Sequence, residues 1–80
     1  MARDSIKLDK PLLSKERWFS AAYECQLWIE EGADDDWPEW LVKQTRRLGY
    51  RKVNSWLSDE DLPFGDYQAG LALAEHCCMV

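Results

Sequence analysis

The stretch from Asp34 to Gly49 carries the signals of one complete helix, and it limits what the rest of the chain can form. Asp36 is a favourable N-cap residue, and Glu39 three positions later can reach back to it as in a capping box. Pro38 falls in the first turn, where a missing N–H group costs little. Gly49 can adopt the positive φ that ends many helices. We therefore predict a helix that begins after Asp36 and stops before Gly49.

Apolar residues also recur at helical spacing in the segment before this stretch. Ser14 is a suitable N-cap for a helix over residues 15–31, which Gly32 would end. Apolar residues from Trp18 to Trp28 recur at helical intervals and cover one broad face together with a second flank. Such breadth is expected of a helix at the centre of a bundle, or of a helix whose second side binds a partner, and the sequence favours neither.

Two further helices are predicted after Gly49. A short one covers residues 50–57, and a last one runs from Asp66 to Cys78. Gly70 inside the last helix either lowers the stability of that helix slightly or marks a point where a second helix approaches closely. With no period-two alternation anywhere, the prediction is an all-α, single-domain bundle of about four helices with short connections. The domain is expected to span residues 14–80, after a flexible arm over residues 1–13.

The charged residues are segregated along the chain, whose net charge is −5. Residues 18–42 contain seven acidic residues and no basic ones. Residues 43–52 contain five basic residues and no acidic ones, namely Lys43, Arg46, Arg47, Arg51 and Lys52. Blocks of opposite sign orient binding partners, although they also form ordinary solvated surface in many proteins.

Catalysis, cofactors and metals have little support in the residue pattern. The chain has one histidine, His76, no glycine-rich phosphate loop, and no nucleophile with a base beside it in sequence. The run Asp34–Asp36 lacks the alternating ligands and distal glutamate of a calcium loop. Cys77 and Cys78 are adjacent, so on a helix they diverge by about 100° and do not converge on zinc with Cys25. We expect a non-enzymatic protein without a cofactor or metal.

Composition also points to a cellular compartment. The cysteine count is odd, which is not typical of a disulfide framework and favours a reducing environment. No stretch approaches the roughly 20 apolar residues of a membrane span, and the first residues lack the apolar segment of a secretory signal. A cytoplasmic protein that does not enter a membrane is expected.

The remaining function class is a protein-binding module that blocks or recruits a partner. Five tryptophans are many for 80 residues, and tryptophan is enriched at binding hot spots. The partner-binding residues predicted from the coincidence of acid, aromatic and base are Asp34, Asp35, Trp37, Trp40, Arg46, Arg47, Arg51 and Lys52. The acidic block could compete for the nucleic-acid-binding groove of a host protein, and a helix apolar on two sides could also pair with its own copy.

Small acidic proteins of this kind are common among phage-encoded inhibitors of host proteins, anti-CRISPR proteins included. The likeness is one of size and charge, without a shared motif.

The alternative is a small DNA-binding regulator with a helix-turn-helix. A helix ending at Gly49 is followed at once by a short one, whose predicted nucleic-acid contacts are Arg51, Lys52, Asn54 and Ser55. With Gly49 as the turn glycine, Gln44 and Ser55 would occupy positions that the motif fills with buried apolar residues. The surrounding acidic residues would also repel phosphate. Nucleic acid is therefore the less favoured partner.

Overall fold

Four helices make up the computed structural model, which describes residues 11–79. They are α2 (Lys15–Glu30), α3 (Glu39–Leu48), α4 (Tyr50–Leu57) and α5 (Phe64–His76). The described range contains no strand, and the predicted all-α bundle with short connections is confirmed. Most of the predicted flexible arm, residues 1–10, lies outside the described residues.

The ends of the helices follow local signals, with two exceptions. Ser14 caps α2 as predicted, since its Oγ accepts a hydrogen bond from the backbone N–H of Arg17 at 3.3 Å. Gly49 ends α3 with a φ of 92°, a conformation that residues with a side chain rarely adopt.

The prediction that Asp36 caps α3 is wrong. Pro38 occupies the N-cap position in an extended conformation, and the helix starts at Glu39. A residue that precedes proline is disfavoured in the helical region, so Trp37 cannot continue a helix from Asp36. The carboxylate of Asp36 instead accepts a hydrogen bond from the N–H of Trp37, its sequence neighbour, at 2.7 Å.

The prediction that the last helix begins at Asp66 is also wrong. Helix α5 begins at Phe64, after Pro63, and Asp66 lies inside its first turn. The helix ends at His76 rather than at Cys78.

Trp18 lies at the centre of the core, and its side chain has no exposed surface. Its ring packs edge-on against Phe19 and also contacts Trp56 of α4, with ring centroids 4.9 and 5.9 Å away. The indole N–H donates to the hydroxyl of Thr45 on α3 at 2.8 Å. That hydroxyl donates in turn to the carbonyl of Leu41, so the buried polar groups are satisfied.

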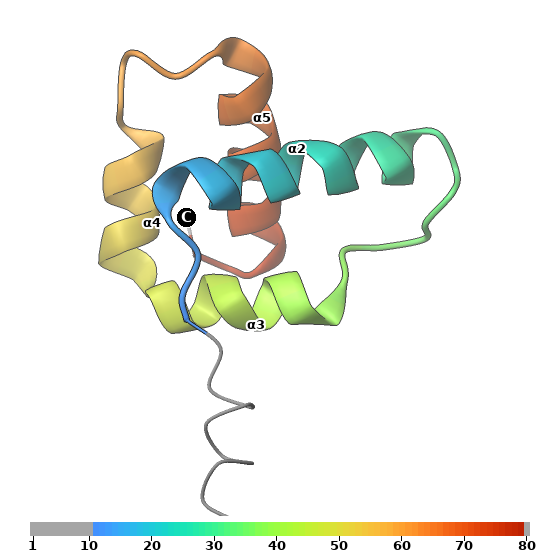
Figure 1. Cartoon of the computed structure of the whole chain (residues 1–80), viewed down its shortest axis with the longest axis horizontal. Coiled ribbons are helices and arrows are strands. Elements are labelled where there is room, and N and C mark those ends of the chain that lie inside the picture. The colour runs from blue at the N-terminus through green and yellow to red at the C-terminus, as the bar shows by residue number, and fades with distance from the viewer. Residues whose placement is uncertain (1–10, 80) are drawn as a thin grey trace, which may run out of the picture.

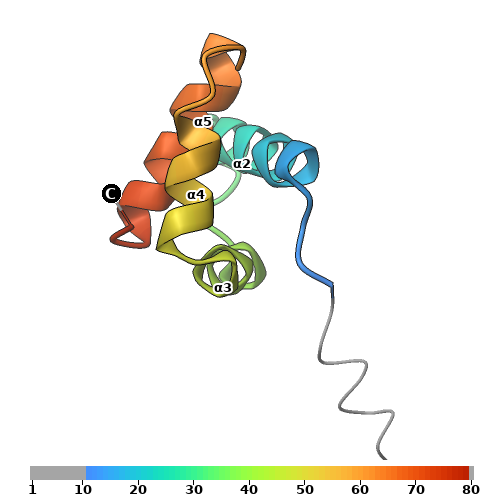
Figure 2. The same ribbon diagram turned by 90° about the vertical axis from the view of Figure 1, so that its left-hand side faces the viewer.

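The largest helix–helix interface joins α2 and α5, which cross each other in both views (Figures 1 and 2). The crossing is close because Gly70 has no side chain. A Cβ atom at Gly70 would lie 2.5 Å from Cε1 of Phe19 and 3.0 Å from Cζ3 of Trp18. The sequence left open whether Gly70 is a mild cost or a close approach, and the structure shows the close approach.

The segment before α2 is held against α3 by one side chain. Gln44, which is almost fully buried, accepts a hydrogen bond from the N–H of Leu13 at 3.2 Å and donates to the carbonyl of Pro11 at 3.4 Å. Leu13 thereby packs against the outside of the core. Gln44 interrupts the apolar stripe of α3 because it binds this extended segment.

The α2–α5 crossing gives the first testable expectation. Gly70→Ala should lower the free energy of unfolding by about 1–2 kcal/mol, because overpacking against Phe19 outweighs the gain of up to about 1 kcal/mol in helix propensity. Urea denaturation followed by circular dichroism measures this. Gly65→Ala on the same helix is the matched control, since its Cβ would meet only the half-exposed ring of Tyr23, which can move aside. Equal stability of the two variants would contradict the close approach.

Candidate functional site: a pocket between two tryptophans

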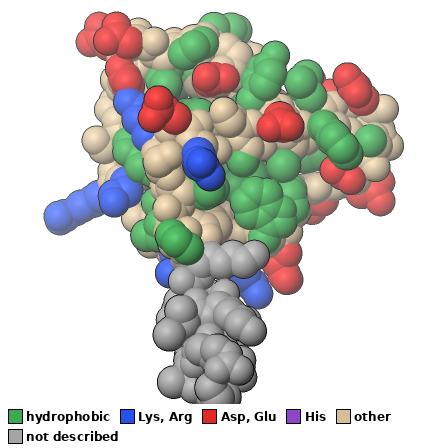
Figure 3. Space-filling model, viewed as in Figure 1, with side chains coloured by type: hydrophobic (Ala, Val, Ile, Leu, Met, Phe, Trp, Pro, Cys, Tyr) green, Lys and Arg blue, Asp and Glu red, His purple; other side chains and the backbone are tan. Residues whose placement is uncertain are grey.

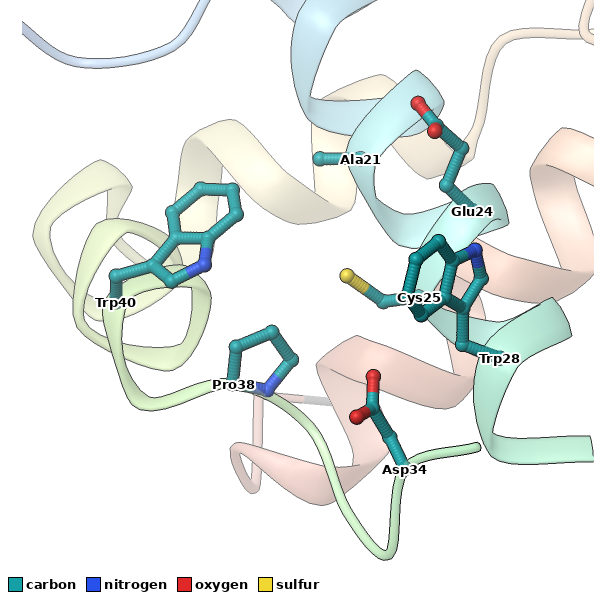
Figure 4. A pocket seen from close by; sticks show the side chains of 7 residues that line it. All are labelled: Ala21, Glu24, Cys25, Trp28, Asp34, Pro38 and Trp40. Atoms are coloured by element: carbon teal, nitrogen blue, oxygen red, sulfur yellow. The ribbon is translucent and has the colours of Figure 1, made fainter. Parts of the chain in front are cut away.

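A pocket of about 420 Å³ opens between α2 and the start of α3. One wall is the second half of α2, and the other is formed by the loop after α2 and the first turn of α3. The lining residues are Ala21, Glu24, Cys25, Trp28, Asp34, Pro38 and Trp40 (Figure 4). We call this site the tryptophan pocket. Its volume falls within the roughly 300–1,000 Å³ of ligand-binding sites.

The two tryptophans of the pocket are unusually exposed for their size. Trp28 keeps 55% of its surface accessible and Trp40 keeps 52%, whereas Trp18 has none. Trp28 lies in the last turn of α2, the helix whose C-terminal part extends past its crossing with α5 (Figure 1). Hydrophobic side chains gather on this face between α2 and α3, with acidic side chains around the far end of α2 (Figure 3). Large exposed apolar groups that share one hollow are typical of interaction sites.

The pocket carries negative charge and, among the described residues that line it, no positive charge. Asp34 points its carboxylate toward the space between Pro38 and Trp28, and Glu24 lies at the rim (Figure 4). Burial and this negative charge both affect the pKa of the Cys25 thiol. Burial raises the pKa of its thiol above the ordinary value, and the carboxylates of Asp34 and Glu24 raise that pKa further. Cys25 is therefore a neutral thiol at neutral pH and not an activated nucleophile.

The structure brings together part of the predicted acidic and aromatic set. Asp34 and Trp40 both line the tryptophan pocket. Asp35 is exposed in the loop outside the pocket lining. Trp37 is half-buried and packs against the core, although it directly precedes Pro38 of the pocket.

The predicted basic residues lie away from the pocket, at the other end of α3. Arg46 and Arg47 are exposed in the last turn of α3, and Arg51 and Lys52 are exposed in the first turn of α4. A helix of ten residues is about 15 Å long, so these cations and Asp34 do not meet in one site. Arg46 lies near enough to Cys77 to oppose the rise that burial causes in the pKa of that thiol.

The residues of the DNA-binding alternative have different surroundings. Asn54 donates hydrogen bonds from Nδ2 to the carbonyl of Tyr50 at 3.0 Å and to the carbonyl of Met79 at 2.7 Å. Both amide hydrogens are thus used within the fold, which removes the donors that would read a base edge. Ser55 is exposed on α4. Gln44 is buried where a helix-turn-helix has an apolar residue, but its partners are the backbone groups of residues 11 and 13.

Five lining residues of the pocket are absent from the set predicted from sequence, namely Ala21, Glu24, Cys25, Trp28 and Pro38. A signal for two of them exists, since Glu24 and Trp28 are four residues apart and share a side of α2. Trp28 was assigned to the apolar face of that helix. The face was identified correctly, but the crossing with α5 leaves its second half uncovered, and a helical repeat carries no information about that crossing.

Comparison with protein-family models, with curated proteins and with solved structures gave no match. Within residues 11–79, no group of three or more histidine, cysteine or acidic side chains is arranged to hold a metal ion. In the same range, none of the helices has the length and apolar character that crossing a bilayer requires.

The electrostatics of the pocket can be tested through Cys25. Asp34→Asn should lower the pKa of the Cys25 thiol, because one of the negative charges that raises it is removed. Alkylation of Cys25 by iodoacetamide at pH 8 should then be a few times faster, because the rate follows the thiolate fraction. Mass spectrometry of tryptic peptides separates Cys25 from Cys77 and Cys78. Asp35→Asn is the control and should leave the rate unchanged; equal rates in both variants would place the Asp34 carboxylate too far from the sulfur.

Proposed function

We propose that this chain is a non-enzymatic protein-binding module whose partner docks on the tryptophan pocket. The observation that carries the proposal is the pair Trp28 and Trp40, each about half exposed, on opposite sides of one hollow. Burial of such side chains at a partner's surface is the most productive use of a small contact area, since tryptophan leads among hot-spot residues.

The charge around the pocket indicates the kind of partner. Seven acidic residues in the segment 18–42 include Glu24 and Asp34 of the pocket itself. A surface of this sign attracts a basic surface and accelerates its approach. Basic grooves are typical of nucleic-acid-binding proteins. The role that fits is therefore an inhibitor or adaptor of phage type, which occupies a nucleic-acid-binding surface of a cytoplasmic host protein.

The proposal predicts that the pocket tryptophans are needed for the partner and not for the fold. Trp28→Ala and Trp40→Ala should each reduce recovery of the partner at least about tenfold, since truncation of a hot spot costs about 2 kcal/mol or more. The measurement is affinity capture from nuclease-treated lysate of the host cell, followed by titration of the recovered protein.

Phe64→Ala is the matched control for this experiment. Phe64 is 72% exposed at the start of α5 and does not line the pocket, so its loss should leave capture intact. Circular dichroism of each variant verifies the fold. A partner that binds all three variants equally would show that the pocket is not the docking site.

A second candidate function is DNA binding by the far end of the molecule. It is favoured by the exposure of Arg51 and Lys52 and by the absence of acidic residues from positions 43 to 58. Because the amide of Asn54 is occupied, such binding would rest on phosphate contacts and would show little sequence preference.

Gel shifts with a mixed-sequence duplex test this second candidate. If it holds, wild-type protein retards the duplex at low salt, and Arg51→Ala combined with Lys52→Ala weakens binding. Each lost phosphate contact should also reduce the salt slope by about one. Trp40→Ala should bind DNA like the wild type. An unshifted duplex at low salt would rule the candidate out.

A further inference from the structure

We propose that the tryptophan pocket accepts an arginine side chain from the partner protein. This inference rests on the proposed function and names the group that the pocket recognises. It follows from three features of the site: the placement of the two indoles, the Asp34 carboxylate directed into the space and that of Glu24 at its rim, and the lack of a cation among the described residues that line it.

The indoles provide two walls on which a planar cation can stack. Trp28 from α2 and Trp40 from α3 stand on opposite sides of the space in Figure 4, with Pro38 and Cys25 between them. The face of an indole attracts a cation more strongly than that of any other aromatic side chain. The guanidinium group is planar and weakly hydrated, so it enters such a space at lower cost than an ammonium group.

The carboxylates supply the directional part of the recognition. Asp34 directs its carboxylate into the space, and Glu24 lies at the rim above Cys25 (Figure 4). A guanidinium group donates several hydrogen bonds in a fixed plane, and its bonds to carboxylates are among the strongest side-chain contacts in proteins. After burial, which has the larger effect, the carboxylates of Asp34 and Glu24 both raise the pKa of the Cys25 thiol, so both lie close to the wall of the pocket that Cys25 forms.

Other occupants satisfy fewer of these groups. An apolar side chain would stack on the indoles but would remove the Asp34 carboxylate from water without a hydrogen-bond donor, which is costly. A phosphate or an acidic side chain would be repelled by Glu24 and Asp34. A lysine would contribute charge, but its ammonium group is compact and strongly hydrated, and it cannot stack.

The test is a titration with capped tripeptides that differ only at the central residue, namely arginine, citrulline, lysine or norleucine. Citrulline keeps the shape of arginine and lacks its charge. The indole N–H resonances of Trp28 and Trp40, assigned with the alanine variants, report on the pocket by NMR. We expect the arginine peptide to shift both resonances in the millimolar range. The citrulline and norleucine peptides should bind at least tenfold more weakly, and lysine should fall between arginine and citrulline.

Variants of the pocket define what the shifts mean. Asp34→Asn and Glu24→Gln should each weaken the arginine peptide several-fold, whereas Asp35→Asn, outside the lining, should bind it like the wild type. The inference is overturned if arginine and citrulline bind equally, if lysine binds as tightly as arginine, or if the arginine peptide shifts neither resonance.

The outcomes separate this inference from the proposed function. If the tryptophan variants lose the partner but the peptides show no preference for arginine, the pocket remains the docking site and arginine is rejected as its occupant. Unchanged capture in those variants would instead reject the docking site. Arginine-dependent self-association, seen as a concentration-dependent mass that Arg51→Ala or Arg46→Ala abolishes, would also overturn the inference, because the occupant would then be a second copy of this chain.

Discussion

The hydrogen bond between the Trp18 indole and the Thr45 hydroxyl determines how α2 lies over α3. The indole is fully buried, so without this acceptor its N–H group would lose its hydrogen bond to water and form no other. Leaving the donor unpaired would cost about 1–3 kcal/mol. The same ring contacts Trp56 and lies under the bare backbone of Gly70. One side chain thus relates α2 to all three other helices of the described chain. Because α2 is anchored through its first half, its second half is left to project and to form one wall of the pocket.

Local signals predicted most of the fold because they act within a few residues. Ser14, Gly32 and Gly49 mark helix ends through backbone hydrogen bonding and positive φ, and neither depends on the rest of the molecule. The short helix over residues 50–57 was likewise predicted with the bounds that α4 has. Asp36 failed because two local rules competed, and the restriction that Pro38 places on Trp37 prevailed over the capping preference of aspartate.

Only part of the pocket lining could be predicted, since the pocket depends on contacts between segments that are distant in sequence. Asp34 and Trp40 stood out because acid and aromatic residues are close together in sequence. Trp28 did not, because a tryptophan on an apolar helical face is covered or exposed according to where another helix crosses. The basic residues were grouped with Asp34 by proximity in sequence, but a straight helix carries Arg46 and Arg47 to its far end. There they have a structural reason, since cations favour the C-terminal end of a helix.

The hydrogen bonds from Gln44 to the segment before α2 have a consequence for protein engineering. Pro11 and Leu13 are held beside Trp40, which also lines the hollow under that segment. A peptide fused ahead of residue 11 would therefore be tethered at the edge of the tryptophan pocket. Tethering replaces a bimolecular encounter by an intramolecular one, with effective concentrations that reach the millimolar range for short linkers. The fold thus offers its own scaffold for displaying weak ligands to the pocket, because a tethered ligand with millimolar affinity would occupy the pocket for a substantial part of the time.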